Sequence, residues 1–517
     1  MRNLTLILAF FAAGEVCSQT LSSVEHSYAG VTGSTVIVRD IPAIGKELVC
    51  YNDAQREQPA FLLHDHANGA YRMFQTFSLP TGTTPQPHTE MHLYVEDMSV
   101  RYLPGYPGLS YCYICGRYNS YIVSEPFDPG LVRYPQGQGG FVGRFLTSDI
   151  GNDNASSFDI QLILINEASS LTRMEMKDGL MAITTMFTTG EEGFTFFTDY
   201  GQGGDYWLVY PTDPMEKITD AAFTGTETLT DAVISADGNS IVAVSRIKDE
   251  FYKFALRIEK PGIAFDMANP VVPLVNFERR SVYDTYGLTH QQSQEPTMTR
   301  HRNDADIRLL AMPGSKEVTV AYECRDTTLS CKVQHNTALF KIEYPNFFVD
   351  YSTSMTGKQM VTGALDNHHT FSDMTYVPYD NTIAILHSRR SGDCEMNTVV
   401  QFPSWNSYGD IDAIMTARQY HRSLDVFKKT YVYLAGFDVT NDHLVHFFQN
   451  KGNMDNSCYL TRPHAWSEEL LGNMPTPTSS IEVLGHLYGP PLFPYTGLAT
   501  PNIIATTYSV SVDCTSY

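Results

Sequence analysis

The sequence predicts an all-β protein, and the arrangement that fits it best is a β-propeller of seven blades. Three observations support this prediction. Tyr and Phe, which are enriched in strands, occur 31 and 28 times in 517 residues. Segments made of a strand, a tight turn and a second strand recur along the chain. Amphipathic helical periodicity is scarce, and residues 467–471 are one of the few short candidates.

The first 18 residues predict a cleaved secretory signal. Arg2 gives a short positive start, and residues 4–13 form an apolar run that is too short to cross a bilayer as a helix. We expect cleavage after Ser18, which leaves residues 19–517. Two alternatives stay open, namely a buried N-terminal strand and a lipoprotein whose acylated residue is Cys17.

Charge and hydropathy limit the classes of partner. The formal net charge is −22 at pH 7, and an acidic surface repels nucleic acid and anionic membranes. No later run of about 18 apolar residues occurs, so we expect no membrane span. Together with the predicted signal, these features indicate a protein that is secreted, periplasmic or on the cell surface.

The repeating unit is clearest in three segments, which begin at Asp231, Ile307 and Met374. Each has two apolar strands around a tight turn, followed by a longer loop and a third strand. Two further segments, from Met98 and Tyr431, fit all or half of the same outline. Each of the three turns carries residues that tight turns favour: Asp237 with Gly238, Pro313 with Gly314, and Asp380 with Asn381.

The unit starts are about 60 to 80 residues apart, which is compatible with blades that carry long loops. That spacing divides the mature chain into seven units, a blade count that propellers use. We expect the strand at residues 35–40 to complete the last blade. Two packed β-sandwich domains are the alternative, but the similar units and the lack of a linker favour a single domain over residues 19–517. The expected blades are 40–80, 90–145, 160–210, 228–260, 305–345, 372–405 and 425–450.

The nine cysteines suggest disulfides, because eight remain after signal removal and an even number in an exported chain is typical of a disulfide framework. Cys324 and Cys331 flank a short polar loop between two strands, so we expect a local bridge between them. Closing this loop would stabilise the fold by roughly 2.5 kcal/mol. Two further pairs are candidates: Cys394 with Cys458, and Cys50 with Cys514.

Cys112 and Cys115 form a Cys-x-x-Cys sequence, which occurs in redox dithiols and in zinc sites. Redox pairs of this kind sit at a helix N-terminus, whereas here the flanking Tyr111, Tyr113 and Tyr118 are strand formers. Strand positions three apart face opposite sides and lie about 10 Å apart. A zinc site would need a second such pair, which the sequence lacks. We therefore expect two strand cysteines that are not bonded to each other.

Two short stretches resemble known repeat proteins. Residues 235–244, SADGNSIVAV, resemble the Ser-x-Asp-Gly turn between strands of many bacterial propeller repeats. Residues 112–116, CYICG, resemble a Cys-Tyr-Phe-Cys-Gly strand signature of uncharacterised exported repeat proteins of Bacteroidetes, with Ile114 in place of Phe. The resemblance implies a secreted β-repeat protein of unassigned activity, and it brings no catalytic residues.

Histidines form two candidate clusters for a metal. His64 and His66 share one face of a possible strand, and His88, Glu90 and His92 share one face of another. Two such clusters could converge on a metal ion. The simpler interpretation is polar side chains that face solvent, and we assign no metal and no cofactor.

Two polar loops could line one rim of a propeller, where loops carry function. One surrounds Asp366, His368 and His369, and the other covers residues 290–302. The chain has no Gly-x-Ser-x-Gly elbow, P-loop or His-Glu-x-x-His sequence. The catalytic residues, if there are any, are therefore unknown from the sequence.

Two functions remain open. The leading hypothesis is a non-enzymatic exported scaffold or binding protein whose loop-built face holds an extracellular or cell-envelope protein or a glycan. The competing hypothesis is a secreted hydrolase that acts on glycans, with acidic residues converging in a central channel. The lack of a recognisable catalytic motif favours binding, although a propeller fold by itself says little about chemistry.

Overall fold

The computed structural model describes most of the strands and their connections. The described residues are 23–41, 44–55, 57–65, 71–75, 88–102, 109–124, 132–147, 160–166, 168–177, 180–188, 190, 192–198, 216–217, 227–234, 241–247, 253–260, 276–287, 307–314, 317–327, 333–343, 354–360, 368–390, 396–402, 410–411, 413–415, 419–427, 430–438, 443–456, 460–461, 464–465, 478–487, 498–499 and 510–516.

The predicted all-β class is confirmed in this part of the chain, where the strands form antiparallel sheets. Seven sheets have four or five strands, and we number them 1 to 7 in chain order. Sheet 1 contains β2 (Gly33–Ile41), β3 (Lys46–Asp53), β4 (Gln58–Asp65) and β5 (Tyr71–Gln75). Sheet 2 contains β6 (His88–Tyr102), β7 (Ser110–Ser124), β8 (Val132–Leu146), β9 (Ile160–Ile165) and β33 (Leu498–Ala499).

Sheets 3 to 5 follow in chain order. Sheet 3 contains β10 (Ala168–Lys177), β11 (Leu180–Phe187), β12 (Glu192–Thr198) and β13 (Glu216–Lys217). Sheet 4 contains β14 (Glu227–Ile234), β15 (Ile241–Ile247), β16 (Lys253–Lys260), β17 (Asn276–Gly287) and β32 (Thr478–Leu487). Sheet 5 contains β18 (Ile307–Ala311), β19 (Glu317–Thr327), β20 (Val333–Glu343) and β21 (Ser354–Met360).

Sheets 6 and 7 end the series. Sheet 6 contains β22 (His368–Val377), β23 (Thr382–Arg390), β24 (Met396–Gln401), β26 (Ala413–Met415) and β30 (Leu460–Thr461). Sheet 7 contains β27 (Gln419–Phe427), β28 (Tyr431–Asp438), β29 (His443–Asn450), β1 (Ser23–Ala29) and β34 (Val510–Ser516). Two short elements complete the described part, namely the pair β25 (Asp410–Ile411) with β31 (His464–Ala465), and the 3-10 helix η3 (Lys451–Asn456).

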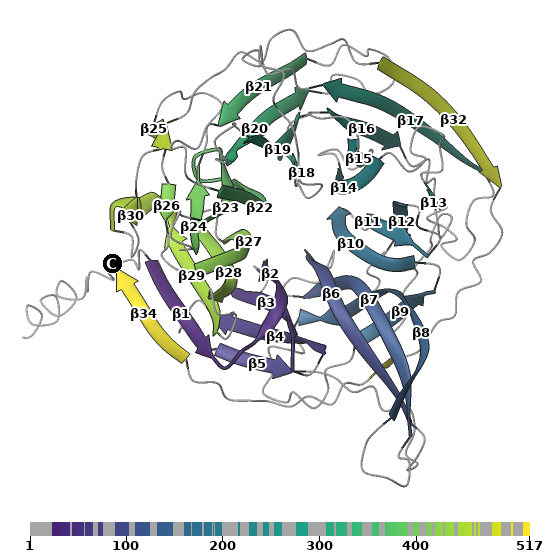
Figure 1. Cartoon of the computed structure of the whole chain (residues 1–517), viewed down its shortest axis with the longest axis horizontal. Coiled ribbons are helices and arrows are strands. Elements are labelled where there is room, and N and C mark those ends of the chain that lie inside the picture. Colours follow the sequence, from purple (N-terminus) through teal and green to yellow (C-terminus); the bar gives the residue numbers. More distant parts are fainter. Residues whose placement is uncertain are drawn as a thin grey trace, which may run out of the picture.

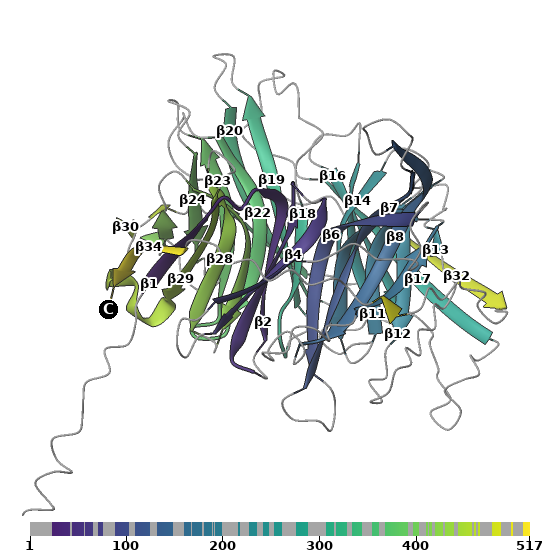
Figure 2. The ribbon, with the colours of Figure 1, turned by 90° about the horizontal axis from the view of Figure 1, so that it is seen from below.

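The sheets surround a common centre, with the first strand of each sheet innermost (Figure 1). These innermost strands, β2, β6, β10, β14, β18, β22 and β27, contact one another in this order, and β27 also contacts β2. Seen from the side, the strands run across the thickness of the molecule (Figure 2). No helix of the described residues is long and apolar enough to cross a membrane.

The last sheet is completed by strands other than the one we expected. Residues 35–40 do not join sheet 7, because they lie in β2, the innermost strand of sheet 1. Sheet 7 instead takes up β1 from residues 23–29, which pairs with β29 on one side and with β34 on the other. Pairing β2 with the nearby β3 closes a short loop, which costs less chain entropy than pairing it with a strand near the C-terminus.

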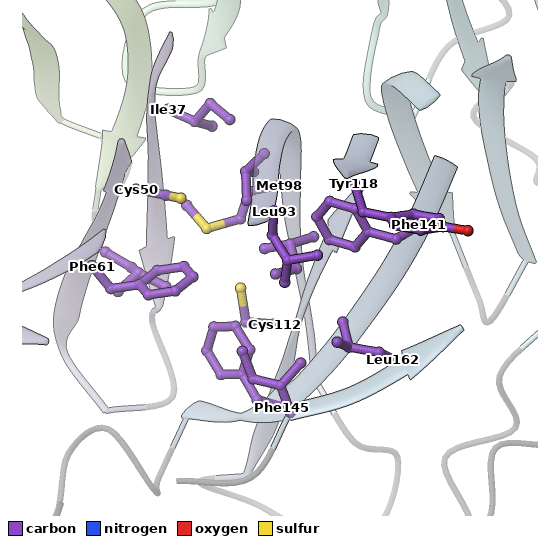
Figure 3. Close-up of a cluster of buried hydrophobic side chains, with 14 of the residues drawn as sticks. Ile37, Cys50, Phe61, Leu93, Met98, Cys112, Tyr118, Phe141, Phe145 and Leu162 are labelled. Carbon is purple, nitrogen blue, oxygen red and sulfur yellow. The ribbon is translucent and has the colours of Figure 1, made fainter. Parts of the chain in front are cut away.

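The hydrophobic cores lie between neighbouring sheets, because alternate side chains of one strand face opposite sides. In β2, Ile37 packs toward sheet 2, whereas Val36 and Val38 pack toward sheet 7. The core between sheets 1 and 2 contains Phe61 and Phe145, whose rings meet edge to face with their centroids 5.3 Å apart (Figure 3).

Two predicted turns lie in the described part. Gly314 has a φ of 70° and Asn381 a φ of 57°, the left-handed region that Gly and Asn tolerate best. Asp380 supports its turn, since its Oδ1 accepts hydrogen bonds from the N and Oγ1 of Thr382 at 3.3 and 2.6 Å. The third predicted turn, at residues 237–238, lies outside the described residues.

Candidate functional site

The most organised charged group in the described residues lies on the seven innermost strands. Each strand carries one Asp or Arg at an equivalent place, and we call this set the inner charged ring. Its sign alternates from sheet 1 to sheet 6, but sheets 6 and 7 both contribute Asp, because an odd number of positions cannot alternate throughout. The members, from sheet 1 to sheet 7, are Arg39, Asp97, Arg173, Asp231, Arg308, Asp373 and Asp425.

A β-bulge directly precedes four of these residues. The register of the innermost strand shifts just before Asp97, Arg173, Asp231 and Asp373. Bulges are known to re-aim side chains at the rims of barrels and beside functional sites. The irregularity therefore sets the direction of the charged side chain that follows it.

The four Asp residues first bind their own strand. Each Oδ1 accepts a hydrogen bond from the backbone N–H of the next residue. The donor–acceptor distances are 2.8 Å at Asp97, 3.0 Å at Asp231, 2.9 Å at Asp373 and 2.8 Å at Asp425. This local bond holds the carboxylate in one orientation and leaves the second oxygen for a neighbour.

Three of the Asp residues use the second oxygen to bind the following sheet. The Oδ2 atoms of Asp97, Asp231 and Asp425 accept hydrogen bonds, each of 2.8 Å, from a backbone N–H of the next sheet around the ring. Each donor is the residue directly after an Arg of the inner charged ring. The donors are Met174, Leu309 and Asp40.

Arg39 joins several members of the ring. Its Nη2 lies 3.0 Å from Asp97 Oδ1, and its Nε donates to the carbonyl oxygen of Met98 at 2.8 Å. Burial alone would lower the pKa of Arg39, but the carboxylates of Asp97, Asp425 and Asp373 raise it above its ordinary value. Arg39 therefore remains a cation that balances the acidic residues on both sides of it.

Burial raises the pKa of Asp231 and of Asp425 above the ordinary value for Asp. Nearby guanidinium groups oppose this shift, from Arg308 and Arg173 at Asp231 and from Arg39 at Asp425. Backbone N–H donors oppose it as well, as expected for carboxylates that accept several hydrogen bonds. The acidic side chains of the ring are thus largely balanced by guanidinium groups and backbone N–H donors.

The residues expected to approach a metal are divided between two places. His64 lies on β4 with its Nδ1 3.5 Å from Glu47 Oε2. His92 lies on β6 with its Nδ1 2.9 Å from Glu57 Oε2 and its Nε2 3.4 Å from Glu90 Oε2. The two carboxylates thus lie at opposite nitrogens of the His92 ring and cannot share one ion with it.

No group of three or more His, Cys, Asp or Glu side chains within the described ranges could hold a metal ion. His66 lies outside those ranges, and so does the side chain of His88, whose backbone begins β6. The same holds for residues 290–302, for Asp366 and for the side chains of the two histidines that follow it on β22.

Cys112 and Cys115 are strand cysteines, as predicted. Both are free, fully buried and on β7, where they face opposite sides of sheet 2. Cys112 belongs to the core with sheet 1, and Cys115 to the core with sheet 3. Burial raises the pKa of both thiols well above the ordinary value, which favours the neutral thiol over the nucleophilic thiolate.

The other predicted disulfides have different outcomes. Cys50 is free and buried on β3, which contradicts the suggested bridge to Cys514. Its side chain points into the apolar core of sheets 1 and 2 (Figure 3), where a cysteine acts as a small hydrophobic residue. Cys324 lies opposite Asn336 in the pairing of β19 with β20. The Cys324 side chain and Cys331 lie outside the described residues, as does the pair of residues 394 and 458.

The sequence interpretation missed the inner charged ring. A signal for it exists, because the first strand of each unit carries an Asp or Arg at this place, and an apolar residue follows in every case except Arg39, which precedes Asp40. Single charges spread over seven units form no cluster in the sequence, unlike the histidine and cysteine pairs.

No family model matches the chain, and no curated protein matches it.

Proposed function

We propose that the chain is a seven-bladed β-propeller that acts outside the cytoplasm as a non-enzymatic binding or scaffold protein. In this proposal sheets 1 to 7 are the blades, and a protein or glycan partner is held on a face of the ring. The hydrogen bonds of the inner charged ring are the observation that carries the proposal.

The propeller assignment is supported by the order of the sheets. Each sheet is built from consecutive strands that begin at the centre, with a few outer strands added from the chain ends. The contact of β27 with β2 joins the last sheet to the first. The pairing of β1 with β29 and β34 places both ends of the chain in one sheet, which is how a propeller protects its closing edge.

The inner charged ring favours binding over hydrolysis. A glycoside hydrolase needs one carboxylic acid that can donate a proton and a second carboxylate that can act as base or nucleophile. Asp97, Asp231 and Asp425 instead use both oxygens to hold backbone N–H groups of two adjacent sheets. Their role in this proposal is to fasten the sheets to one another, which leaves recognition to the faces of the ring.

Export is the second component of the proposal and rests on the predicted signal at residues 1–18. Mass spectrometry of the protein released by expressing cells tests it. A mature chain that begins after Ser18 supports export, and a retained chain that begins at Met1 contradicts it.

The function is tested by incubating the purified protein with a panel of glycans and of extracellular and cell-envelope proteins, with binding and turnover measured in the same samples. We expect saturable binding to at least one partner without product. Turnover that is lost in Asp373→Asn, or metal-dependent turnover that is lost in His66→Ala, would contradict the proposal and favour the hydrolase.

A further inference from the structure

The interface between sheet 7 and sheet 1 joins the two ends of the chain, and we call it the closure seam. Most of it is apolar, with a core that contains Tyr28 from β1, Val38 from β2 and Phe437 from β28. The ring is complete only when this seam forms, since sheet 7 is assembled from strands at both ends of the sequence.

One end of the closure seam is polar, unlike the rest of it. A row of ionisable residues crosses sheet 1, where Asp40 on β2 lies opposite Glu47 on β3, and Glu47 lies opposite His64 on β4. Glu47 is completely buried and His64 is 3% exposed. Buried charges of this kind are stable only when they are paired, so their protonation affects how firmly the seam holds.

Sheet 7 contributes ionisable groups to the same end of the seam. The ring of His26 on β1 lies 6.0 Å from the ring of His64, centroid to centroid. Asp425 on β27 accepts the hydrogen bond from the N–H of Asp40 and acts electrostatically on Glu47. The structure describes further titratable residues at the seam. They are Tyr28, Tyr51, Tyr431 and Tyr433 in or against its core, Lys46 next to Glu47 on β3, Tyr71 opposite His64 in register, and His446 opposite His26 in register.

The closest pair in this cluster is Glu47 with His64. Glu47 Oε2 and His64 Nδ1 are 3.5 Å apart, so a single proton suffices to make them either an ion pair or two neutral groups. When that proton leaves, a carboxylate remains buried beside a neutral imidazole and near Asp425. Burial disfavours this ionised form of Glu47.

We propose that the closure seam is a pH-sensitive latch, held shut while Glu47 and His64 share one proton and loosened when the pair loses it. The latch joins β1 of sheet 7 to sheet 1. Its opening frees the strands from the chain ends before the other sheets separate.

The direction of the pH dependence follows from the burial of Glu47. Burial raises the pKa of Glu47 from 4.5 to about 7, against the opposing effect of His64 and with a small further rise from Asp425. A pKa that is higher in the folded than in the unfolded state gives a stability that is complete below the lower value and is lost as pH rises through the higher one. The seam is therefore firmest in acid, weakens as the pH rises from about 4.5 to about 7, and does not weaken further above that value.

The experiment measures thermal unfolding at about pH 5.5 and about pH 8.5 for the full chain and for two variants of the pair. In the wild type we expect the midpoint to fall by about 2–4 °C or more over this interval. Glu47→Gln mimics the protonated acid and should remove most of that fall. His64→Gln removes the group that stabilises the ionised Glu47 and should enlarge it. Asp380→Asn removes a carboxylate that is paired with Lys451 and not with a histidine; it is the control, and its pH profile should run parallel to that of the wild type.

Hydrogen exchange locates the effect. After correction for the intrinsic rate, amides of β1 should lose protection in the wild type at the higher pH, while those of β7 keep it. Parallel pH profiles in Glu47→Gln and the wild type, or an equal loss at β1 and β7, would overturn the proposal. If Glu47→Gln does not fold, His64→Gln and the wild-type hydrogen exchange still test the proposal. The proposal is contradicted if the unfolding midpoint of His64→Gln falls between the two pH values by no more than that of the wild type.

Discussion

Sheet 1 has two neighbours, and its two faces meet them in different ways. Toward sheet 2 it presents Ile37, Cys50 and Phe61 to a core of apolar side chains and thiols with Tyr118 among them (Figure 3). Toward sheet 7 it presents a core of aliphatic and aromatic side chains, with Glu47 and His64 at one end. The first interface joins sheets that follow each other in the chain, and the second joins its two ends.

The difference indicates that the stability of the two interfaces depends differently on pH. The ionic contacts between sheets 1 and 2, Arg39 with Asp97 and His92 with Glu57, lie outside the apolar core, and each has one partner that is partly exposed. The core itself depends little on pH, because it contains no group that titrates near neutrality. An interface with a buried acid–histidine pair depends on pH between mild acid and neutrality. Because the titratable pair lies at the closure seam, the interface between sheets 7 and 1 is the one whose stability depends on pH.

The largest expected effect comes from the apolar interface. Phe145→Ala removes a ring that is 1% exposed and packed edge to face on Phe61, and it should reduce the free energy of unfolding by about 3–5 kcal/mol. Urea denaturation at mildly acidic and mildly alkaline pH checks both the size and the expected lack of pH dependence. Tyr134→Ala on the same strand removes a ring that is 53% exposed and should cost less than about 0.5 kcal/mol. Equal losses in the two variants would show that the core of sheets 1 and 2 is not packed as described.

The next effect concerns the inner charged ring, which links the sheets on both sides of this comparison. Asp97→Asn leaves the N–H groups of Met98 and Met174 and the guanidinium of Arg39 with one fewer acceptor. We expect a loss of about 3 kcal/mol, because breaking a buried pair leaves a charge without its partner.

The neighbouring carboxylate provides the control for Asp97. Glu96→Gln removes the same charge one residue earlier, at a side chain that is 30% exposed and 3.6 Å from the exposed Arg117. It should cost about 1 kcal/mol or less. If both variants lose the same amount in chemical denaturation, the inter-sheet hydrogen bonds of the ring contribute nothing specific.

The first sheet and the chain ends also show how far the sequence predicts the fold. Alternating apolar residues and the turn residues at 313–314 and 380–381 are local signals, and they indicated the strand pairs around those turns, β18 with β19 and β22 with β23. The pairing of β1 with β29 joins residues more than 400 positions apart, and no local pattern reports such a choice. Residues 35–40 and 23–29 both look like strands, so the sequence could not tell which of them enters sheet 7.

The inner charged ring and the closure seam were harder to predict for the same reason. Glu47 and His64 occur in ordinary strand sequences, and only the packing of β1 against sheet 1 makes them a buried cluster. The face taken by Cys112 and Cys115 was predictable, because it depends on the alternation within a single strand.

The smallest expected effect is a gain in stability on β2, the strand that faces both interfaces. Thr35 has a φ of 50° at the bulge between residues 34 and 36, a conformation that is unfavourable for a β-branched side chain. Thr35→Gly should raise the free energy of unfolding by about 1 kcal/mol, as measured by urea denaturation. Ser34→Gly, one residue earlier and without a positive φ, should bring no gain in stability. An equal gain in both variants would show that backbone strain at residue 35 is not the cause.

Closure of the ring through the chain ends is the central claim, and a disulfide tests it most directly. Ser27 on β1 and Ser511 on β34 are partners in the register of sheet 7, so Ser27→Cys combined with Ser511→Cys should allow oxidation to an intramolecular bond. We predict a monomer in which peptide mapping finds residue 27 joined to residue 511, with a higher unfolding midpoint than the reduced form. Failure to form this bond, or its formation only between two copies of the chain, would contradict the closure described here.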